Sequence, residues 1–229
     1  MNSEFSRRTL LRRFTGVAAG AALVAAGEGL LAPLAAQAAD APSNTSKSAN
    51  GWDVLDAHSP ETAIHAIPGT NLRVTLRRGD AATVLAYVAQ RFHYDVMPLE
   101  ASRGQVLGYA ADLQVKSDFE SNHLSGTALA LYPDNYPLGS KGNLYPNQVT
   151  AIRDIVAELQ GVVKWGGDMQ PVKESTFFLD VPPDSTKLAL VARTLKEWGV
   201  TPGKGAGTQN VEDPKRMAAA KKLADKQAA

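Results

Sequence analysis

The chain contains no cysteine among its 229 residues. Disulfide bonds therefore cannot stabilise it in any compartment, and its stability has to come from an ordinary hydrophobic core. The central part of the sequence, residues 60–205, has the size of one domain that can bury such a core. No internal repeat is visible, so the sequence predicts a single folded domain between two polar ends.

The chain also lacks a strong charge of either sign, with 24 Lys and Arg against 23 Asp and Glu. The central part has no basic stripe with interleaved aromatic residues, which is the pattern typical of nucleic-acid binding. We therefore expect no nucleic-acid partner. Two catalytic patterns are missing from the sequence as well: the G-x-S-x-G elbow of serine hydrolases and the H-E-x-x-H metal motif.

The first 38 residues have the three parts of a cleaved export signal. The run 6–12, Ser-Arg-Arg-Thr-Leu-Leu-Arg, resembles the S-R-R-x-F-L-K pattern of twin-arginine (Tat) signals. An alanine-rich apolar stretch follows over 17–34, and residues 36–38, Ala-Gln-Ala, have the small-x-small pattern that a signal peptidase accepts. Residues 1–38 are therefore predicted to be a twin-arginine signal peptide.

A transmembrane anchor is the alternative interpretation of the apolar stretch. Glu28 and Pro33 interrupt it, whereas a spanning helix needs about 20 predominantly apolar residues. We expect the chain to use the Tat export machinery and to be secreted or cell-wall associated, and not to be an integral membrane protein after cleavage.

The two segments that flank the domain are polar. Residues 39–59 begin with a stretch rich in Ser, Asn, Ala and Pro and are predicted to be a flexible linker. Residues 206–229 are rich in Lys and Ala and present no wide apolar stripe, so they are predicted to be disordered or loosely helical.

Hydrophobic periodicity predicts mixed secondary structure within the domain. Apolar residues recur at helical spacing over 80–92, 146–160 and 185–198. Short apolar runs bounded by turn residues at 105–109, 127–131, 162–165 and 176–181 are typical of strands. Because these elements do not alternate as a regular βαβ repeat, we expect an α+β fold with a small antiparallel sheet packed with helices.

The most informative stretch is 121–130, Ser-Asn-His-Leu-Ser-Gly-Thr-Ala-Leu-Ala. It resembles the S-x-H-x-x-G-x-A-x-D motif of the M15 peptidase family, the zinc D-Ala-D-Ala and L-Ala-D-Glu peptidases. The stretches 135–139, 146–148 and 161–168 follow in the order and spacing that such domains show. The resemblance covers about residues 72–181 and implies an M15 peptidase-like fold of the Hedgehog and DD-peptidase type.

The resemblance also implies a zinc site, but with incomplete ligands. A catalytic zinc takes three protein ligands and activates a water in the fourth position. His123 matches the first ligand, whereas Ala130 stands at the aspartate position and Phe177 at the second histidine position. Neither a methyl group nor a phenyl ring can donate a lone pair to a metal. Glu174 stands three residues before Phe177, at the position of the family's general base.

Three interpretations follow. The first is an exported pseudoenzyme without zinc that binds peptidoglycan stem peptides or another cell-wall component, with Ser121, Trp165 and Asp168 as candidate cleft residues. The second is an active zinc metallopeptidase, a D-alanyl-D-alanine carboxypeptidase, with a remodelled metal site that contains His123 and Glu174. The third is an interaction protein that keeps only the scaffold, because a fold does not determine a function.

Overall fold

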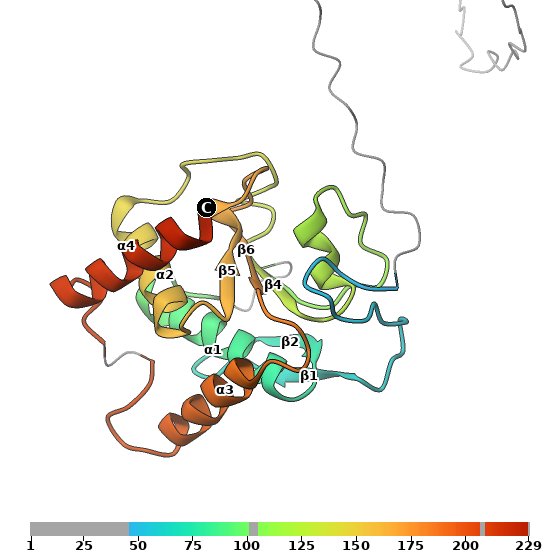
Figure 1. Cartoon of the computed structure of the whole chain (residues 1–229), viewed down its shortest axis with the longest axis horizontal. Helices are drawn as coiled ribbons and strands as arrows, with labels where there is room; N and C mark the ends of the chain where they lie inside the picture. The colour runs from blue at the N-terminus through green and yellow to red at the C-terminus, as the bar shows by residue number, and fades with distance from the viewer. Residues whose placement is uncertain (1–45, 101–104, 207–208, 229) are drawn as a thin grey trace, which may run out of the picture. The chain divides into compact units, whose positions relative to one another are not determined.

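The computed structural model describes residues 46–100, 105–206 and 209–228. The predicted signal peptide, residues 1–38, lies outside the described residues. The described chain is an α+β domain with two small antiparallel sheets and four α-helices, which agrees with the α+β class predicted from the sequence (Figure 1). None of the helices in these ranges combines the length and the apolar character that crossing a membrane requires.

The three predicted helices are confirmed. They are α1 (Asp80–Asp95), α2 (Pro146–Glu158) and α3 (Thr186–Gly199). Pro146 occupies the first turn of α2, where a missing N–H costs nothing. The Ser185 hydroxyl accepts a hydrogen bond from the Leu188 N–H and so caps α3, since the first N–H groups of a helix have no partner within it.

The four predicted strands form the larger sheet. They are β3 (Val106–Leu107), β4 (Ala128–Leu131), β5 (Val163–Trp165) and β6 (Thr176–Leu179), in the spatial order β3-β4-β6-β5. All neighbouring strands in this sheet are antiparallel.

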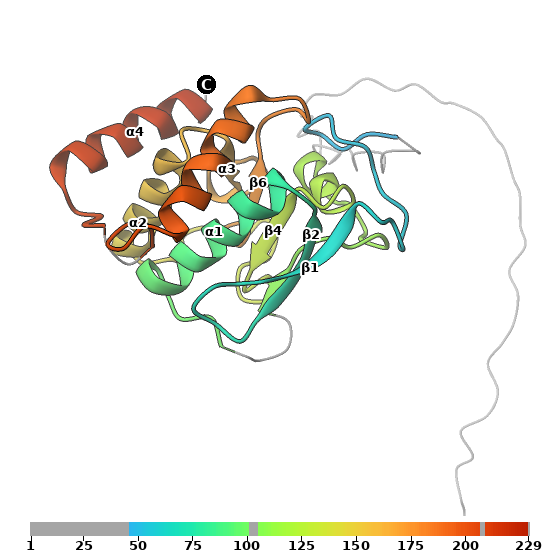
Figure 2. The same cartoon turned by 90° about the horizontal axis from the view of Figure 1, so that it is seen from below.

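A second sheet was not predicted from the sequence. Strands β1 (Thr62–Ala66) and β2 (Arg73–Arg77) pair as an antiparallel ribbon next to α1 (Figure 2). Val74 and Leu76 on β2 are buried, whereas Ile64 on β1 is 67% exposed. With only one covered side, β1 has no continuous apolar run that the sequence could reveal.

The two faces of the larger sheet pack against different elements. Leu129 and Phe177 are cross-strand neighbours and belong to the main core, where Phe177 meets Phe92 of α1 edge to face. Ala128 and Phe178 are also paired, and they face the 3₁₀-helix η1 (Asp118–His123), where the rings of Phe178 and Phe119 stack. Successive side chains of a strand point to opposite faces, so the register assigns every residue of β4 and β6 to one of these sides.

The prediction of a flexible linker over 39–59 is wrong for its described part, residues 46–59. Trp52 and Leu55 are 7% exposed, and the Trp52 indole N–H donates to the Val181 carbonyl at 2.8 Å. The guanidinium of Arg77 lies 5.1 Å from the Trp52 ring centre. Hydrogen bonds as well as burial fix this polar segment, and hydrophobic periodicity does not detect hydrogen bonds.

The tail predicted over 206–229 contains a packed helix. Helix α4 (Pro214–Ala228), drawn in red in Figure 1, lies along α2 and buries Ala220 and Ala224. Near the C-terminal end of α4, the Gln227 side chain donates to the Val163 carbonyl of β5 at 3.0 Å. Small alanine side chains allow this close packing, and they contribute little to the apolar stripe that sequence analysis looks for.

Candidate functional site

His123 lies at the end of η1 and is fully buried. Its Nδ1 lies 2.7 Å from the carbonyl oxygen of Gly108. A carbonyl can only accept, so Nδ1 carries the proton and Nε2 keeps a lone pair. None of the described protein atoms forms a hydrogen bond with Nε2. Burial lowers the pKa of His123 to about 4, so the ring is neutral near pH 7.

Glu174 is almost fully buried, and its carboxylate organises a loop. It accepts hydrogen bonds from the backbone N–H of Gly142 at 2.8 Å and of Asn143 at 3.0 Å, and one more from the Asn143 side chain. Its backbone carbonyl accepts the indole N–H of Trp165 at 2.8 Å. These contacts explain Glu174 as a structural anchor, because three N–H groups already occupy the carboxylate oxygens.

The positions that match the two missing ligands lie on opposite faces of the sheet. Phe177 faces α1 and is paired with Leu129, whereas Ala130 is paired with Thr176 on the side of η1. An aspartate at position 130 and a histidine at position 177 would therefore point away from each other. The residue across from Ala130 is Thr176, whose side chain cannot replace a histidine as a zinc ligand.

The described residues do not fit a zinc ion. No group of three or more His, Asp and Glu side chains in the described ranges is arranged to hold a metal. Near His123 lies an ion pair instead, in which the Lys173 ammonium contacts the Glu120 carboxylate at 2.6 Å. Both side chains of this pair are buried.

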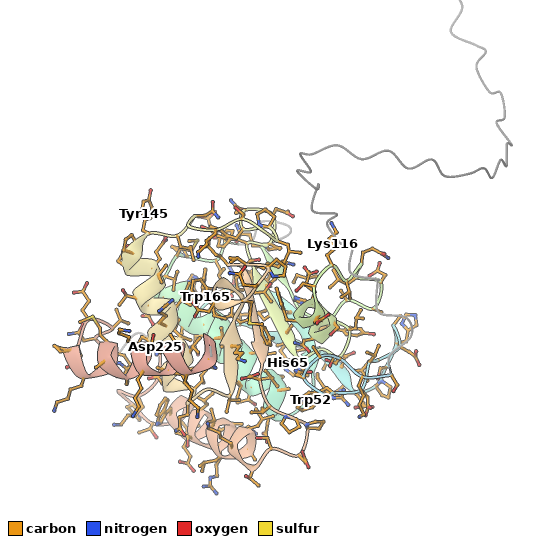
Figure 3. The ribbon with its side chains drawn as sticks, turned by 45° about the horizontal axis from the view of Figure 1, so that its top comes forward. Trp52, His65, Lys116, Tyr145, Trp165 and Asp225 are labelled. Atoms are coloured by element: carbon orange, nitrogen blue, oxygen red, sulfur yellow. The ribbon has the colours of Figure 1, made fainter. Side chains whose placement is uncertain are left out.

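The three candidate cleft residues are not exposed in one groove. The Ser121 hydroxyl accepts the Ala49 N–H at 2.9 Å, on the side of the N-terminal segment. Trp165 is 4% exposed and lies among other side chains, whereas Tyr145 projects outward (Figure 3). Asp168 pairs with Arg153 at 2.8 Å, and burial raises the pKa of Asp168 although Arg153 opposes the shift.

Two larger hollows of the described surface lie elsewhere. Trp165 and Asp168 line a gap against α4 that encloses only about 10 Å³. A hollow of about 390 Å³ lies at the C-terminal end of α3 beside Trp198, and one of about 410 Å³ lies beside Arg78 at the N-terminal end of α3. None of the five predicted site residues lines either of these two hollows.

The polar residues of the 121–127 segment bind the N-terminal segment of the same chain. The Asn50 N–H donates to the Asn122 side-chain oxygen at 3.1 Å, and the Asn50 side chain donates to the Thr127 hydroxyl at 2.9 Å. The hydroxyls of Ser48 and Ser125 are 3.0 Å apart. The stretch that resembles a metal motif therefore acts here as a hydrogen-bonding surface.

Gly126 permits the turn that presents this surface. Its φ is +70°, and an added Cβ would lie 2.8 Å from the backbone nitrogen of Arg77. The Gly126 carbonyl accepts the Arg77 N–H at 2.9 Å. Only glycine fits both the left-handed backbone and this close approach to β2.

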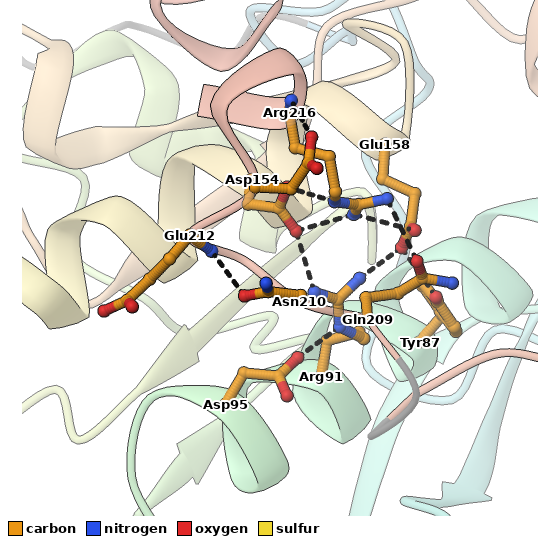
Figure 4. Close-up of polar contacts among 10 residues, drawn as sticks. Tyr87, Arg91, Asp95, Asp154, Glu158, Gln209, Asn210, Glu212 and Arg216 are labelled. Carbon is orange, nitrogen blue, oxygen red and sulfur yellow. Dashed lines mark hydrogen bonds and ion pairs between the residues drawn. The ribbon is translucent and has the colours of Figure 1, made fainter. Parts of the chain in front are cut away.

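A buried charged network, the Arg91 cluster, was missed by the sequence analysis (Figure 4). Two arginines face three carboxylates in it. The residues that form its ion pairs are Arg91, Asp95, Asp154, Glu158 and Arg216. Arg91 is fully buried and binds Asp154 at 2.9 Å, and it also contacts Asp95 and Glu158.

Arg216 brings α4 into the Arg91 cluster. Two of its nitrogens bind the two oxygens of Asp154 at 2.8 and 2.7 Å, and one of them also contacts Glu158 at 3.1 Å. The Tyr87 hydroxyl donates to Glu158 at 2.7 Å, and burial together with this carboxylate raises the pKa of Tyr87. The cluster therefore connects α1, α2 and α4.

The sequence does contain a signal for this cluster. Arg91 lies at helical spacing with the apolar residues Val84 and Val88, on the face that becomes buried. Asp154 and Glu158 are four residues apart beside the buried Ile155. A single arginine and two carboxylates on the apolar sides of two helices indicate a buried ion pair, because buried charges are paired.

Comparisons with family models, with curated proteins and with solved structures found no match to this chain.

Proposed function

We propose that this chain is an exported, non-catalytic domain that is similar in scaffold to the M15 peptidases and binds peptides of the cell wall. The sequence motifs at 121–130 and 161–168 support the scaffold, and the pattern of residues 1–38 supports export. The α+β fold with its small antiparallel sheet is compatible with this proposal.

One observation carries the non-catalytic part: both retained catalytic positions serve the structure. His123 is sealed inside the domain, and the Glu174 carboxylate is occupied by three N–H donors. A general base has to reach the proton that it removes. A buried carboxylate that holds a loop has no such access.

The binding part is supported by what the 121–127 segment does. Its side chains bind the backbone N–H groups of Ala49 and Asn50, which are the kind of group that any peptide offers. A surface built from Ser, Asn and Thr oxygens recognises peptide without a metal.

The test combines zinc and peptide titrations by calorimetry, with elemental analysis of the purified protein. We expect no stoichiometric zinc and a measurable affinity for peptidoglycan stem peptides. His123→Ala is the control for zinc, and Glu174→Gln is the control for hydrolysis. One equivalent of zinc that depends on His123, or cleavage of stem peptides that Glu174→Gln abolishes, would overturn the proposal in favour of an active metallopeptidase.

If stem peptides are neither bound nor cleaved, the part of the proposal that names a cell-wall ligand is wrong. The third interpretation, a scaffold with a different partner, would then replace it.

A further inference from the structure

Residues 48–51, which we call the Asn50 turn, form a compact reverse turn that is held by its own backbone. The Ser48 N–H donates to the Trp52 carbonyl at 2.7 Å, and the Gly51 N–H donates to the Ser48 carbonyl at 2.8 Å. Gly51 has a φ of +83°, and a Cβ added there would meet no atom within 4 Å. Both bonds join residues of the N-terminal segment itself, so their formation requires no partner from the rest of the domain.

In the described ranges, the domain meets this turn with hydrogen-bond acceptors. We call the oxygens of Ser121, Asn122 and Thr127, with the Leu179 carbonyl, the acceptor face. They receive the Ala49 N–H at 2.9 Å, the Asn50 N–H at 3.1 Å and the two donor contacts of the Asn50 carboxamide at 2.9 Å each. The four contacts are neutral, so no buried ion pair holds the turn in place.

One polar group of the acceptor face is left over. The side-chain Nδ2 of Asn122 is fully buried and has no hydrogen-bond partner among the described residues. Its orientation is fixed, since the oxygen of the same amide accepts the Asn50 N–H. A buried donor without an acceptor is costly, so the Asn50 turn satisfies this face incompletely.

We propose that the acceptor face is a peptide-binding site that the Asn50 turn occupies in cis. The ligand is a short peptide that offers two adjacent backbone N–H donors and a carbonyl oxygen, which accepts from Asn122 Nδ2. Such a ligand makes the two backbone contacts of the turn and adds the missing one to Asn122 Nδ2, and it binds when the turn leaves. This inference rests on the proposed peptide-binding function and locates its site.

Asn50→Asp in the full chain tests the exchange. The substitution keeps the shape of the side chain but places a carboxylate oxygen against the Leu179 carbonyl, so the two acceptors repel and the turn is released. Asn135→Asp is the matched control, because Asn135 is exposed and the charge change is the same. The probe is a fluorescein-labelled peptide with the sequence of residues 46–54, and fluorescence anisotropy measures its binding.

We expect Asn50→Asp to bind the probe at least ten-fold more tightly than the wild type and Asn135→Asp. Equal affinity in the three proteins would overturn the inference. If the probe binds to Asn50→Asp and stem peptides do not, the peptide site stands and the cell-wall ligand fails. The two proposals are therefore tested separately.

Hydrogen exchange of the wild type provides a test that does not need the variant to fold. We expect the amides of Ala49 and Asn50 to exchange through a local opening, well before those of Leu129 and Phe177 in the central strands. If the amides of the turn exchange only together with the central strands, the turn is a permanent part of the fold and the inference is wrong.

Discussion

The Arg91 cluster and the Asn50 turn both attach a terminal segment to the domain, but they use opposite chemistry. The cluster fixes α4 through a fully buried arginine and charged hydrogen bonds. The turn is fixed by neutral hydrogen bonds to Ser121, Asn122 and Thr127. Removing one partner of a buried ion pair leaves a charge without compensation, whereas a neutral group can exchange its partner for water or a ligand. The comparison predicts a permanent attachment at α4 and an exchangeable one at the turn.

The largest effect is expected for Asp154→Ala in the Arg91 cluster. The substitution removes the carboxylate that both Arg91 and Arg216 bind, and it leaves Arg91 buried with less compensation. We expect the free energy of unfolding to fall by about 3–5 kcal/mol, as measured by urea denaturation. Asp184→Ala removes an exposed carboxylate and should change it by less than about 0.5 kcal/mol. A loss below about 1 kcal/mol for Asp154→Ala would show that the cluster does not lock α4.

A second large effect is expected on acidification, because the buried side chain of His123 is neutral in the folded protein. Acidification should therefore lower the free energy of unfolding. The pKa of His123 is about 4 in the folded protein, whereas an unfolded histidine titrates near 6.5. The unfolded state therefore binds more protons between these values. Stability is complete above about pH 6.5 and falls as the pH decreases toward 4, by on the order of 3 kcal/mol.

Denaturation of the wild type and His123→Gln over this pH range measures the effect. The variant should lose most of the slope. His65 is the control, because burial lowers its pKa too, but it is only partly buried and His65→Gln should keep most of the slope. Parallel curves for the wild type and His123→Gln would contradict the assignment.

Whether the sequence predicts a structural element depends on the kind of interaction that stabilises the element. The helices from Asp80, Pro146 and Thr186 bury apolar stripes, so the period of 3.6 residues predicted them. Helix α4 buries alanines and uses Arg216 as its anchor, and no hydrophobic pattern contains that information. The described part of the expected linker packs through Trp52 and a polar turn, which also lack a periodic signal.

The candidate site, too, was predictable from the sequence only in part. The sequence singled out 121–130 as informative, and the structure gives this stretch a dense set of contacts. Assigning roles position by position could not show that Ala130 and Phe177 face opposite sides, because this depends on strand register. The stretch binds a distant segment of the chain: Ala49 and Ser121, which share a hydrogen bond, are 72 residues apart in sequence. No local sequence pattern connects the two segments.

A smaller effect is expected for Ser121→Ala at the acceptor face. The Ala49 N–H loses its acceptor, which should lower the free energy of unfolding by about 1 kcal/mol and accelerate exchange of the Ala49 amide. Ser140→Ala removes a similar hydroxyl, which accepts from Asn143 at 2.8 Å at an exposed position, and should leave the Ala49 amide unchanged. If both variants accelerate its exchange equally, the Ser121 hydroxyl does not hold the turn.

The smallest effect is expected for Lys221→Ala, and it separates burial from charge pairing within α4 itself. Lys221 and Asp225 form an ion pair at 2.8 Å, but their side chains are 74% and 64% exposed. Solvent screens such a pair, so its removal should change the free energy of unfolding by less than about 0.5 kcal/mol in urea denaturation. Asp154→Ala breaks an ion pair of similar length with Arg216 of the same helix, but inside the domain. If Lys221→Ala and Asp154→Ala lowered the free energy of unfolding by comparable amounts, charge pairing alone would attach α4. Burial would then not explain why α4 is attached more firmly than the neutral Asn50 turn.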